Sequence, residues 1–248
     1  MIKVLVHGSN GKMGGHVLSE IAKSDDLELF CGVDLKSTGN ESYKYYDSFD
    51  KVEGKADVII DFSFHTLVKS VLDYAVKSET PVLIATTALD DEDKKSVARA
   101  SQKIPVFLAA NMSVGVALLA DFAKRAAAMF PDADIEIVEA HHNRKVDAPS
   151  GTAVMLANSI KEVRPEAEYV YGRGGEAKRN KNEIGIHALR MANIVGEHEV
   201  YITTESQQLV LRHNAYDRAL FADGACKAAR FLVDKQAGLY TMQDMFKN

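Results

Sequence analysis

The chain has 248 residues, of which 46% are hydrophobic and 26% charged, and its formal net charge is −5. The apolar content excludes a globally disordered chain, and the acidic balance argues against nonspecific nucleic-acid binding, so no nucleic-acid partner is expected. The two cysteines, Cys31 and Cys226, lie in apolar contexts. This favours buried thiols over a disulfide framework.

The hydropathy of the chain gives no sign of a membrane segment or a secretion signal. No run approaches the ~20 apolar residues that a helix needs to cross a bilayer. The first residues, MIKVLVHGSNGKMGG, have too short an apolar stretch for a signal peptide and lack a small-residue cleavage site. We therefore expect a cytoplasmic protein with no membrane partner.

The first half of the chain alternates short apolar runs, typical of strands, with helical patterns. Each run is almost wholly apolar, which is typical of a parallel sheet covered by helices on both faces. Right-handed crossovers make such a sheet doubly wound, as in Rossmann-type α/β domains. The expected strands are residues 2–7, 27–34, 56–63, 81–87 and 104–109, and the expected helices are residues 12–23, 67–75 and 91–102.

The pattern changes after Asn111, where strands in series replace the strict alternation. Such a series predicts an α+β unit with an open mixed sheet. We therefore expect a dinucleotide-binding domain formed by 1–112 and 216–248, with a second domain inserted at 113–215. The expected elements here are helices at 114–129, 150–163 and 217–235, strands at 135–141, 184–190, 197–204 and 208–213, and a polar glycine-rich loop at 172–183. The last helix is expected to dock on the first domain.

A glycine-rich turn, Gly8-Ser-Asn-Gly11-Lys-Met-Gly14, follows the first strand and opens the first helix. Glycines at these positions let the backbone approach a pyrophosphate at the positive end of the helix. Asp34 ends the second strand, where an acidic side chain binds the ribose hydroxyls of NADH and disfavours NADPH, although Lys36 partly offsets this. A plain glycine-rich turn and an ordinary strand-end aspartate are the alternatives.

Polar residues follow three further strands of the expected sheet, at residues 61–63, 86–87 and 111–113. The carboxyl ends of parallel strands meet at one edge of a sheet, where such sheets bind ligands. Each group alone is explained by a loop cap. Together they favour a cofactor crevice.

The string EAHHNRKVDAPSGTA, residues 139–153, ends a strand, crosses a polar loop and starts a helix with Ser-Gly-Thr. A helix N-terminus with small hydroxyl residues is an anion site. Lys145 supplies a cation and a proton, and His141 and His142 supply donors and titratable groups. The string therefore suits a small molecule with carboxylates. Adjacent strand residues point to opposite faces, so the two histidines do not suit a shared metal, and no metal site is expected.

These motifs resemble the 4-hydroxy-tetrahydrodipicolinate reductase (dihydrodipicolinate reductase) family of the diaminopimelate route to lysine. The resemblance runs essentially end to end and rests on VHGSNGKMG, ATT, AANMSVGV, EAHHNRKVDAPSGTA, IGIHALR, IVGEHEV and FADGACKAARFL. It implies that NADH or NADPH binds the first domain and that the second domain binds the substrate. It also implies a homotetramer and hydride transfer from the nicotinamide to a ring carbon of a cyclic dicarboxylate.

The resemblance also implies roles for individual residues. His141 lies nearest the chemistry, and Lys145 donates the proton. The substrate carboxylates are held by His142, Lys145, Ser150, Gly151 and Thr152. The cofactor is lined by Gly8, Gly11, Lys12, Met13, Gly14, Asp34, Ala85, Thr86, Thr87, Ala110, Asn111 and Met112.

Two positions depart from the family pattern. The fourth strand ends in Ala85-Thr-Thr-Ala88, where the family often has Gly-Thr-Thr-Gly, so this loop brings two extra methyl groups to the place where the family's backbone meets the cofactor. Phe64 and His65 follow Ser63, where the family often has a proline. Neither departure touches the catalytic string.

Two rival functions remain open on the residues alone. Another two-domain nicotinamide dehydrogenase would share the glycine turn, although a short-chain dehydrogenase is disfavoured because no tyrosine has a lysine four residues later. A redox-sensing nucleotide-binding regulator would also keep the turn. It would not need His141, Lys145 and the Ser-Gly-Thr segment together.

The strands of the second domain carry apolar residues at alternating positions, namely Val200 and Ile202, and Leu209 and Leu211. An exposed apolar sheet face or edge is a liability unless it is covered. We expect a partner subunit to cover it. The alternative is a sheet covered by the helices expected at 114–129 and 150–163.

Overall fold

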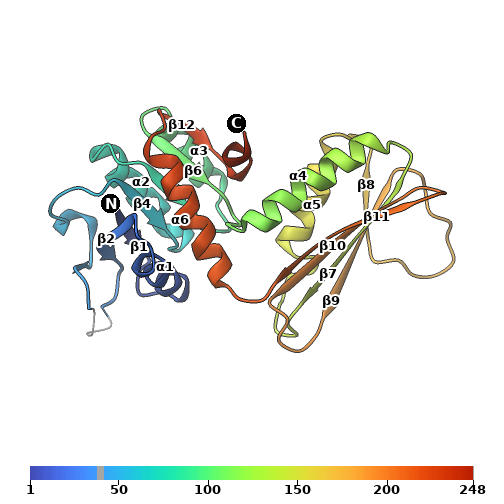
Figure 1. The fold of residues 1–248 in the computed structure, drawn as a ribbon, viewed down its shortest axis with the longest axis horizontal. Helices are drawn as coiled ribbons and strands as arrows, with labels where there is room; N and C mark the ends of the chain where they lie inside the picture. The colour runs from blue at the N-terminus through green and yellow to red at the C-terminus, as the bar shows by residue number, and fades with distance from the viewer. Residues whose placement is uncertain (38–41, 248) are drawn as a thin grey trace. The chain divides into compact units, whose positions relative to one another are not determined.

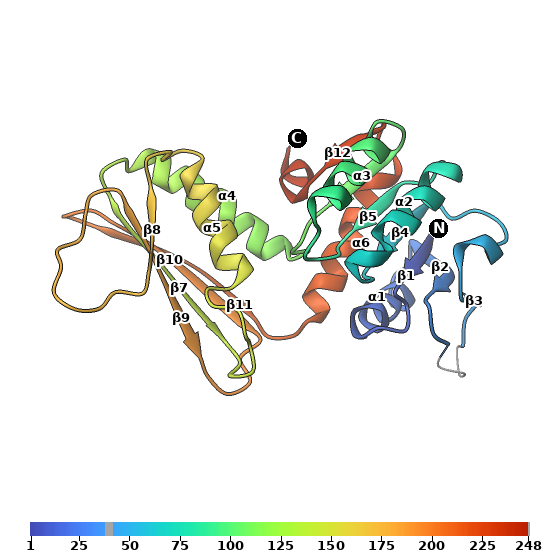
Figure 2. The same cartoon turned by 180° about the vertical axis from the view of Figure 1, so that it is seen from behind.

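The computed structural model describes residues 1–37 and 42–247. The chain divides into two compact units, Met1–Ser113 with Arg218–Asn248 (unit 1) and Val114–Asp217 (unit 2). Figures 1 and 2 show each unit as a sheet with its own helices.

Unit 1 contains a seven-stranded sheet, within the described residues, in the order β12-β6-β5-β4-β1-β2-β3. All its strand pairs are parallel. Helices α1 and α6 pack together on one face, and α2 and α3 pack together on the other (Figures 1 and 2). This is a doubly wound sheet, and it confirms the expected fold class of this part of the chain.

The strands of unit 1 are β1 (Ile2–His7), β2 (Leu27–Val33), β3 (Tyr45–Tyr46), β4 (Val58–Asp61), β5 (Val82–Ile84), β6 (Pro105–Leu108) and β12 (Gly238–Tyr240). Its α-helices are α1 (Lys12–Ala22), α2 (Val68–Lys77), α3 (Asp91–Ser101) and α6 (Ala219–Val233). Short 3₁₀ helices lie at Phe49–Lys51, His65–Leu67 and Met242–Phe246. Strands β4 and β5 are wholly buried, and so are the last four residues of β1, because helices cover both sheet faces.

Unit 2 is a five-stranded mixed sheet, in the part of the chain that the structure describes, with the order β11-β10-β7-β9-β8. The central strand β7 pairs antiparallel with β10 and parallel with β9. The strands are β7 (Asp134–His141), β8 (Glu168–Tyr171), β9 (Glu183–Arg190), β10 (Gly196–Thr203) and β11 (Gln208–Ala215). Helices α4 (Val114–Met129) and α5 (Gly151–Lys161) pack against each other.

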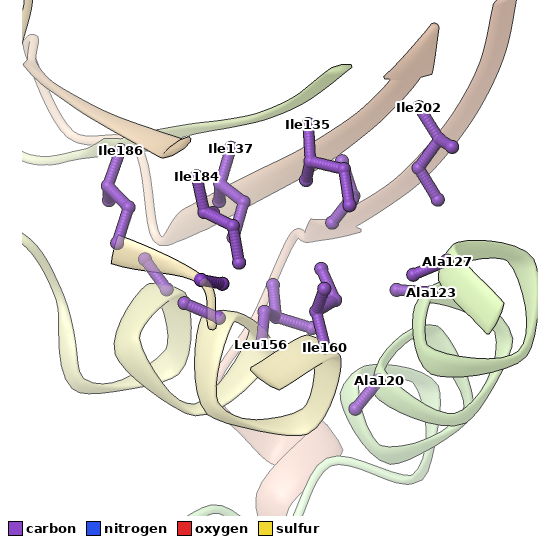
Figure 3. Packing of buried hydrophobic residues seen from close by; sticks show 14 of the residues in the cluster. Ala120, Ala123, Ala127, Ile135, Ile137, Leu156, Ile160, Ile184, Ile186 and Ile202 are labelled. Atoms are coloured by element: carbon purple, nitrogen blue, oxygen red, sulfur yellow. The ribbon is translucent and has the colours of Figure 1, made fainter. Parts of the chain in front are cut away.

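The core of unit 2 lies between the sheet and these two helices (Figure 3). Isoleucines of β7, β9 and β10 point toward alanines of α4 and toward Leu156 and Ile160 of α5. The alternation along β10 puts Val200 and Ile202 on this face, with 0% and 2% of their surfaces exposed.

The chain's own helices therefore cover the β10 part of the apolar row that the sequence suggested for association, Val200 and Ile202. Leu211 packs against the same core from β11. The rationale for a partner subunit built on Val200 and Ile202 is wrong, because α4 and α5 already bury these side chains. Leu209 is partly exposed at the edge strand.

Candidate active site

The glycine turn of unit 1 requires glycine at two positions for separate reasons. Gly8 has φ of +77°, and a Cβ there would lie 2.9 Å from the Phe62 carbonyl oxygen. A Cβ on Gly14 would lie 2.2 Å from the Gly8 carbonyl oxygen, so only glycine lets α1 start this close to β1. Helix α1 has no side-chain cap at Gly11 and no acidic residue in its first turn. Its amino end therefore presents backbone amides to an anion, as a pyrophosphate site requires.

Asp34 lies beside this turn, immediately after β2. Its Oδ2 accepts a hydrogen bond of 3.0 Å from the backbone amide of Asn10. The Asn10 side chain in turn donates to the Lys36 carbonyl oxygen at 2.6 Å and accepts from the Tyr43 hydroxyl at 2.9 Å. The turn and the end of β2 are therefore held together, with the carboxylate next to the glycines.

A buried polar network joins the ends of β1, β4 and β5. Asp61 is fully buried, and its Oδ1 lies 2.7 Å from His7 Nδ1. Its Oδ2 accepts from the Thr86 hydroxyl at 2.7 Å, and its Oδ1 also accepts from the Ser63 amide at 3.1 Å. The carboxylate of Asp61 thus connects the ends of β1, β4 and β5 through hydrogen bonds. Sequence reasoning placed Asp61 at this edge but missed its partner His7. In the sequence, His7 is only the last residue of an apolar strand, and nothing there links it to Asp61.

The other residues expected to line the cofactor differ in exposure. Lys12, Thr87 and Ala110 are exposed, and Met13 and Asn111 are half-buried. Ala85, Thr86 and Met112 are buried. The Thr86 hydroxyl is engaged by Asp61 and by the Ser63 carbonyl oxygen, so its side chain positions the loop after β5.

A cavity of about 650 Å³ opens beside the end of β2 in unit 1. It is lined by residues of the strand ends, of the segment that contains the first 3₁₀ helix, and of α2: His7, Val33, Asp34, Leu35, Asp47, Ser48, Phe49, Asp50, Val52, Gly54, Leu67, Ser70, Asp73, Tyr74, Lys77 and Ser78. Asp34 and Leu35 place one end of it next to the glycine turn, where a nucleotide's ribose and base require space.

The central feature of unit 2 is the carboxylate of Glu139, on β7. Only 1% of the residue's surface is exposed. Arg190 holds both carboxylate oxygens with two bonds of 2.8 Å, the Ser150 amide donates to Oε1 at 2.9 Å, and His141 Nδ1 lies 2.6 Å from Oε2. Burial favours the protonated form, but the hydrogen bonds from His141, Arg190 and Ser150 outweigh it and hold the pKa of Glu139 at about 2.

His198 and Ser150 complete this cluster. The Ser150 hydroxyl caps α5 by accepting from the Ala153 amide at 3.2 Å, and it lies 3.1 Å from His198 Nε2. The His198 ring meets the His141 ring edge-on, with centroids 5.2 Å apart. Burial and the neighbouring His141 lower the pKa of His198 to about 3. The Ser150 hydroxyl, expected to bind substrate, is thus engaged inside unit 2.

Lys145 lies in the loop between β7 and α5, with 20% of its side chain exposed. Its Nζ pairs with Asp147 Oδ1 at 2.8 Å, and this contact lowers the pKa of Asp147. His142 and Thr152 are half-buried and Gly151 is exposed. An added Cβ on Gly151 would meet no atom within 4 Å, so the first turn of α5 borders open space.

Sequence reasoning missed three members of this cluster. Glu139 was quoted within the string without a role, and Arg190 and His198 lie about fifty residues further along the chain. The sheet brings them together, because β9 pairs Arg190 with His141 and β10 pairs His198 with Glu139. A charged residue at the end of a mostly apolar strand was the available signal for Arg190.

No group of three or more His, Cys, Asp or Glu side chains could hold a metal ion among residues 1–37 and 42–247. No helix in the same ranges is both long and apolar enough to cross a membrane.

A doubly wound parallel sheet with a glycine turn, followed by a second unit with a buried His–Glu–Arg cluster beside a helix N-terminus, defines the class of two-domain nicotinamide-dependent oxidoreductases. Family models described as "Dihydrodipicolinate reductase, N-terminus" and "Dihydrodipicolinate reductase, C-terminus" match residues 2–112 and 115–246. The chain therefore belongs to the dihydrodipicolinate reductase family.

Individual relatives agree over the full length. The chain is 46% identical to the 4-hydroxy-tetrahydrodipicolinate reductase of Caldanaerobacter subterraneus subsp. tengcongensis, covering 100% of this chain and 99% of the relative. It is 40% identical to that of Clostridium tetani, covering 100% and 98%. The dipicolinate-bound dihydrodipicolinate reductase of Paenisporosarcina sp. TG-14 superposes with a TM-score of 0.83 at 28% identity, covering 97% of each chain.

Proposed function

We propose that this chain reduces 4-hydroxy-tetrahydrodipicolinate to tetrahydrodipicolinate in the cytoplasm, as a step of lysine and diaminopimelate biosynthesis. The proposal is carried by one observation: family membership extends through the segment in which the Glu139–His141 pair, Lys145 and the amino end of α5 lie together. The relatives named 4-hydroxy-tetrahydrodipicolinate reductase match this chain over 99% and 98% of their own length.

The residues of unit 1 fit a nicotinamide cofactor, because the cradle at Gly8 and Gly14 admits no side chain and α1 is uncapped. Bound NADH or NADPH would supply the hydride. NADH is the favoured cofactor, because the Asp34 carboxylate beside the turn suits ribose hydroxyls and repels a 2′-phosphate. Lys36 follows two residues later and leaves NADPH usable.

The residues of unit 2 bind and protonate the substrate. The amino end of α5, at Gly151 and Thr152, and His142 bind the substrate carboxylates and orient the ring. The ring hydroxyl leaves with a proton of the adjacent carbon as water, and hydride then adds to the carbon that carried the hydroxyl. Lys145 leaves Asp147 to approach the substrate and donates a proton to the adjacent ring carbon. His141 donates a hydrogen bond to the substrate beside Lys145.

Purified protein, tested for loss of NADH absorbance with 4-hydroxy-tetrahydrodipicolinate, decides this proposal. Substrate-dependent oxidation of NADH, abolished in the double variant His141→Gln/Lys145→Ala, is expected. A protein that binds NADH with no substrate-dependent oxidation is a nucleotide-binding regulator, and the proposal then fails.

Association into a homotetramer is a separate proposal, which rests on family resemblance. The sheet face of unit 2 opposite α4 and α5 carries charged and aromatic residues, such as Glu199, Tyr201 and Arg212. Light scattering at micromolar concentration is expected to give four times the mass of one chain. A monomeric mass refutes the proposal.

A further inference from the structure

Glu139, His141, Arg190 and His198 form a row at one end of the unit 2 sheet. Glu139 and His141 are two residues apart on β7, so their side chains project from the same face. Arg190 of β9 lies opposite His141, and His198 of β10 lies opposite Glu139. Ile135 and Ile137 lie on the same face of β7, earlier in the strand. This face of the strand is therefore apolar at its start and polar at its end.

The contacts of Glu139 determine which nitrogen of His141 carries a proton. The carboxylate accepts from both terminal nitrogens of Arg190 and from the Ser150 amide. These partners can only donate. They hold the pKa of Glu139 at about 2, so the carboxylate has no proton to give at neutral pH. The bond of 2.6 Å to His141 must therefore be donated by His141 Nδ1.

The other ring nitrogen, His141 Nε2, is the atom that remains for a ligand. It makes no hydrogen bond to any residue within 1–37 and 42–247. Gly196 of β10 lies next to it, and a Cβ on Gly196 would be 3.1 Å from Nε2. With Nδ1 protonated, a neutral ring has only a lone pair at Nε2, and only the imidazolium can donate from this atom.

The neighbouring ring of His198 does not compete with His141 as a donor of positive charge, because burial lowers the pKa of His198 to about 3. The charged and titratable groups near this pair of rings are Glu139, Arg190, His198, His213, Lys145 and Asp147. Of these groups, Glu139 is the one bonded to His141 Nδ1.

We propose that Glu139 is a positioning residue of the reductase reaction: clamped by Arg190, it holds His141 as the Nδ1–H tautomer, so that Nε2 faces the substrate and binds its carboxylate only when the ring is protonated. The substrate and its direction of reduction are those of the proposed function, on which this inference rests. Substrate binding through His141 is therefore lost as the ring deprotonates.

Replacement of Glu139 by glutamine reverses the tautomer, for a reason visible in the donor count. If the new amide nitrogen takes the place of Oε1, it faces two donors, Arg190 Nη2 and the Ser150 amide. If it takes the place of Oε2, it faces only one fixed donor, Arg190 Nη1, and His141 can adapt by accepting at Nδ1. The second arrangement puts the proton of the neutral ring on Nε2.

Two-bond ¹H–¹⁵N NMR spectra of the ¹⁵N-labelled enzyme test the tautomer without substrate. The His141 signals are identified by their loss in His141→Gln. At a pH where the ring is neutral, we expect the Nδ1–H pattern in the wild type and the Nε2–H pattern in Glu139→Gln. A wild-type His141 that carries its proton on Nε2 overturns the inference, whether or not the protein is a reductase.

Kinetics test the consequence for substrate binding. In the wild type, kcat/KM for the substrate falls as the pH rises. This alkaline limb of the pH profile is expected to be absent in His141→Gln. In Glu139→Gln, kcat/KM falls roughly 100-fold at the low-pH side of the profile, because the imidazolium has lost its carboxylate. The alkaline limb itself disappears, because the neutral ring carries its proton on Nε2 and still donates to the substrate. The dissociation constant of NADH stays nearly unchanged. An alkaline limb that persists in Glu139→Gln overturns the inference.

Two further variants separate this role from a structural one. Gly196→Ala leaves Glu139 in place but crowds Nε2, so we expect kcat/KM to fall roughly 10-fold with the tautomer unchanged. Glu136→Gln is the matched control, because Glu136 lies on the same strand and bonds His187 Nε2 at 2.7 Å on the opposite sheet face. Unchanged kcat/KM in Gly196→Ala, or an equal loss in Glu136→Gln, overturns the inference.

Discussion

Acidification should remove the contribution of Glu139 to the stability of unit 2. The ordinary pKa of this carboxyl is 4.5, and in the folded chain it is about 2. The unfolded chain therefore binds more protons between these values, and stability is fully present above pH 4.5 and lost as the pH falls toward 2. The difference corresponds to about 3 kcal/mol of unfolding free energy at neutral pH.

A comparison with Glu139→Gln isolates this contribution, because glutamine does not titrate. The stability gap between wild type and variant should narrow by about 2 kcal/mol between pH 7 and pH 3. Urea unfolding at each pH measures the gap. Since the chain contains no tryptophan, both proteins carry Phe130→Trp, a reporter beside the unit 2 core. Other carboxyl groups titrate alike in both proteins and cancel.

Glu168→Gln serves as the control, because Glu168 is an exposed residue of the same unit. The unfolding free energy of Glu168→Gln should differ from that of the wild type by no more than about 0.5 kcal/mol at every pH. A gap between wild type and Glu139→Gln that is the same at pH 7 and pH 3 refutes the reasoning. It would mean that Glu139 is not held as a carboxylate by Arg190 and His141.

Four further changes have defined outcomes. Lys145→Ala should lower kcat ~10²–10⁴-fold with NADH affinity nearly unchanged, as measured by steady-state kinetics and fluorescence titration, and a raised KM alone would leave this lysine only as a carboxylate ligand. Asp34→Ala should weaken NADH more than NADPH, and an unmoved ratio of dissociation constants excludes it as the ribose ligand. Ala88→Gly should stabilise the chain by about 1 kcal/mol in thermal unfolding, because Ala88 has φ of +59°; a loss of stability contradicts this. Thr86→Val should cost about 2 kcal/mol in the same assay, because the buried Asp61 loses a hydroxyl donor; equal stability would show that this bond does not form.

Regular elements were predictable where their periodicity was long. The helix at 114–129 and the first strand agree with the structure at both ends, and other boundaries moved by one to a few residues. Strands β3, β8 and β12 were missed because they are short strands at sheet edges with no buried residue. Such short edge strands are defined by pairing with a neighbour, which leaves no alternation in the sequence.

The site was predictable only where its residues are adjacent in the chain. The segment from His141 to Thr152 could be recognised because a strand end, a loop and a helix start follow one another. Arg190 and His198 could not, because strand register, not sequence spacing, brings them to Glu139. The departure at Ala88 from the family's glycine was visible in the sequence, but its positive φ required the structure.

The insertion of unit 2 into unit 1 has a consequence for synthesis on the ribosome. Helix α6 packs on α1 and against β4, β5 and β6, yet it is encoded after the whole of Val114–Asp217. Synthesis proceeds at ~5–20 residues per second, so the apolar sheet face of the nascent Met1–Ser113 segment remains without α6 for on the order of 10 s. Unit 2 is continuous in sequence and can fold in that interval. A chaperone that shields apolar surface should therefore bind nascent chains that end before Arg218 and release them once Val233 has emerged.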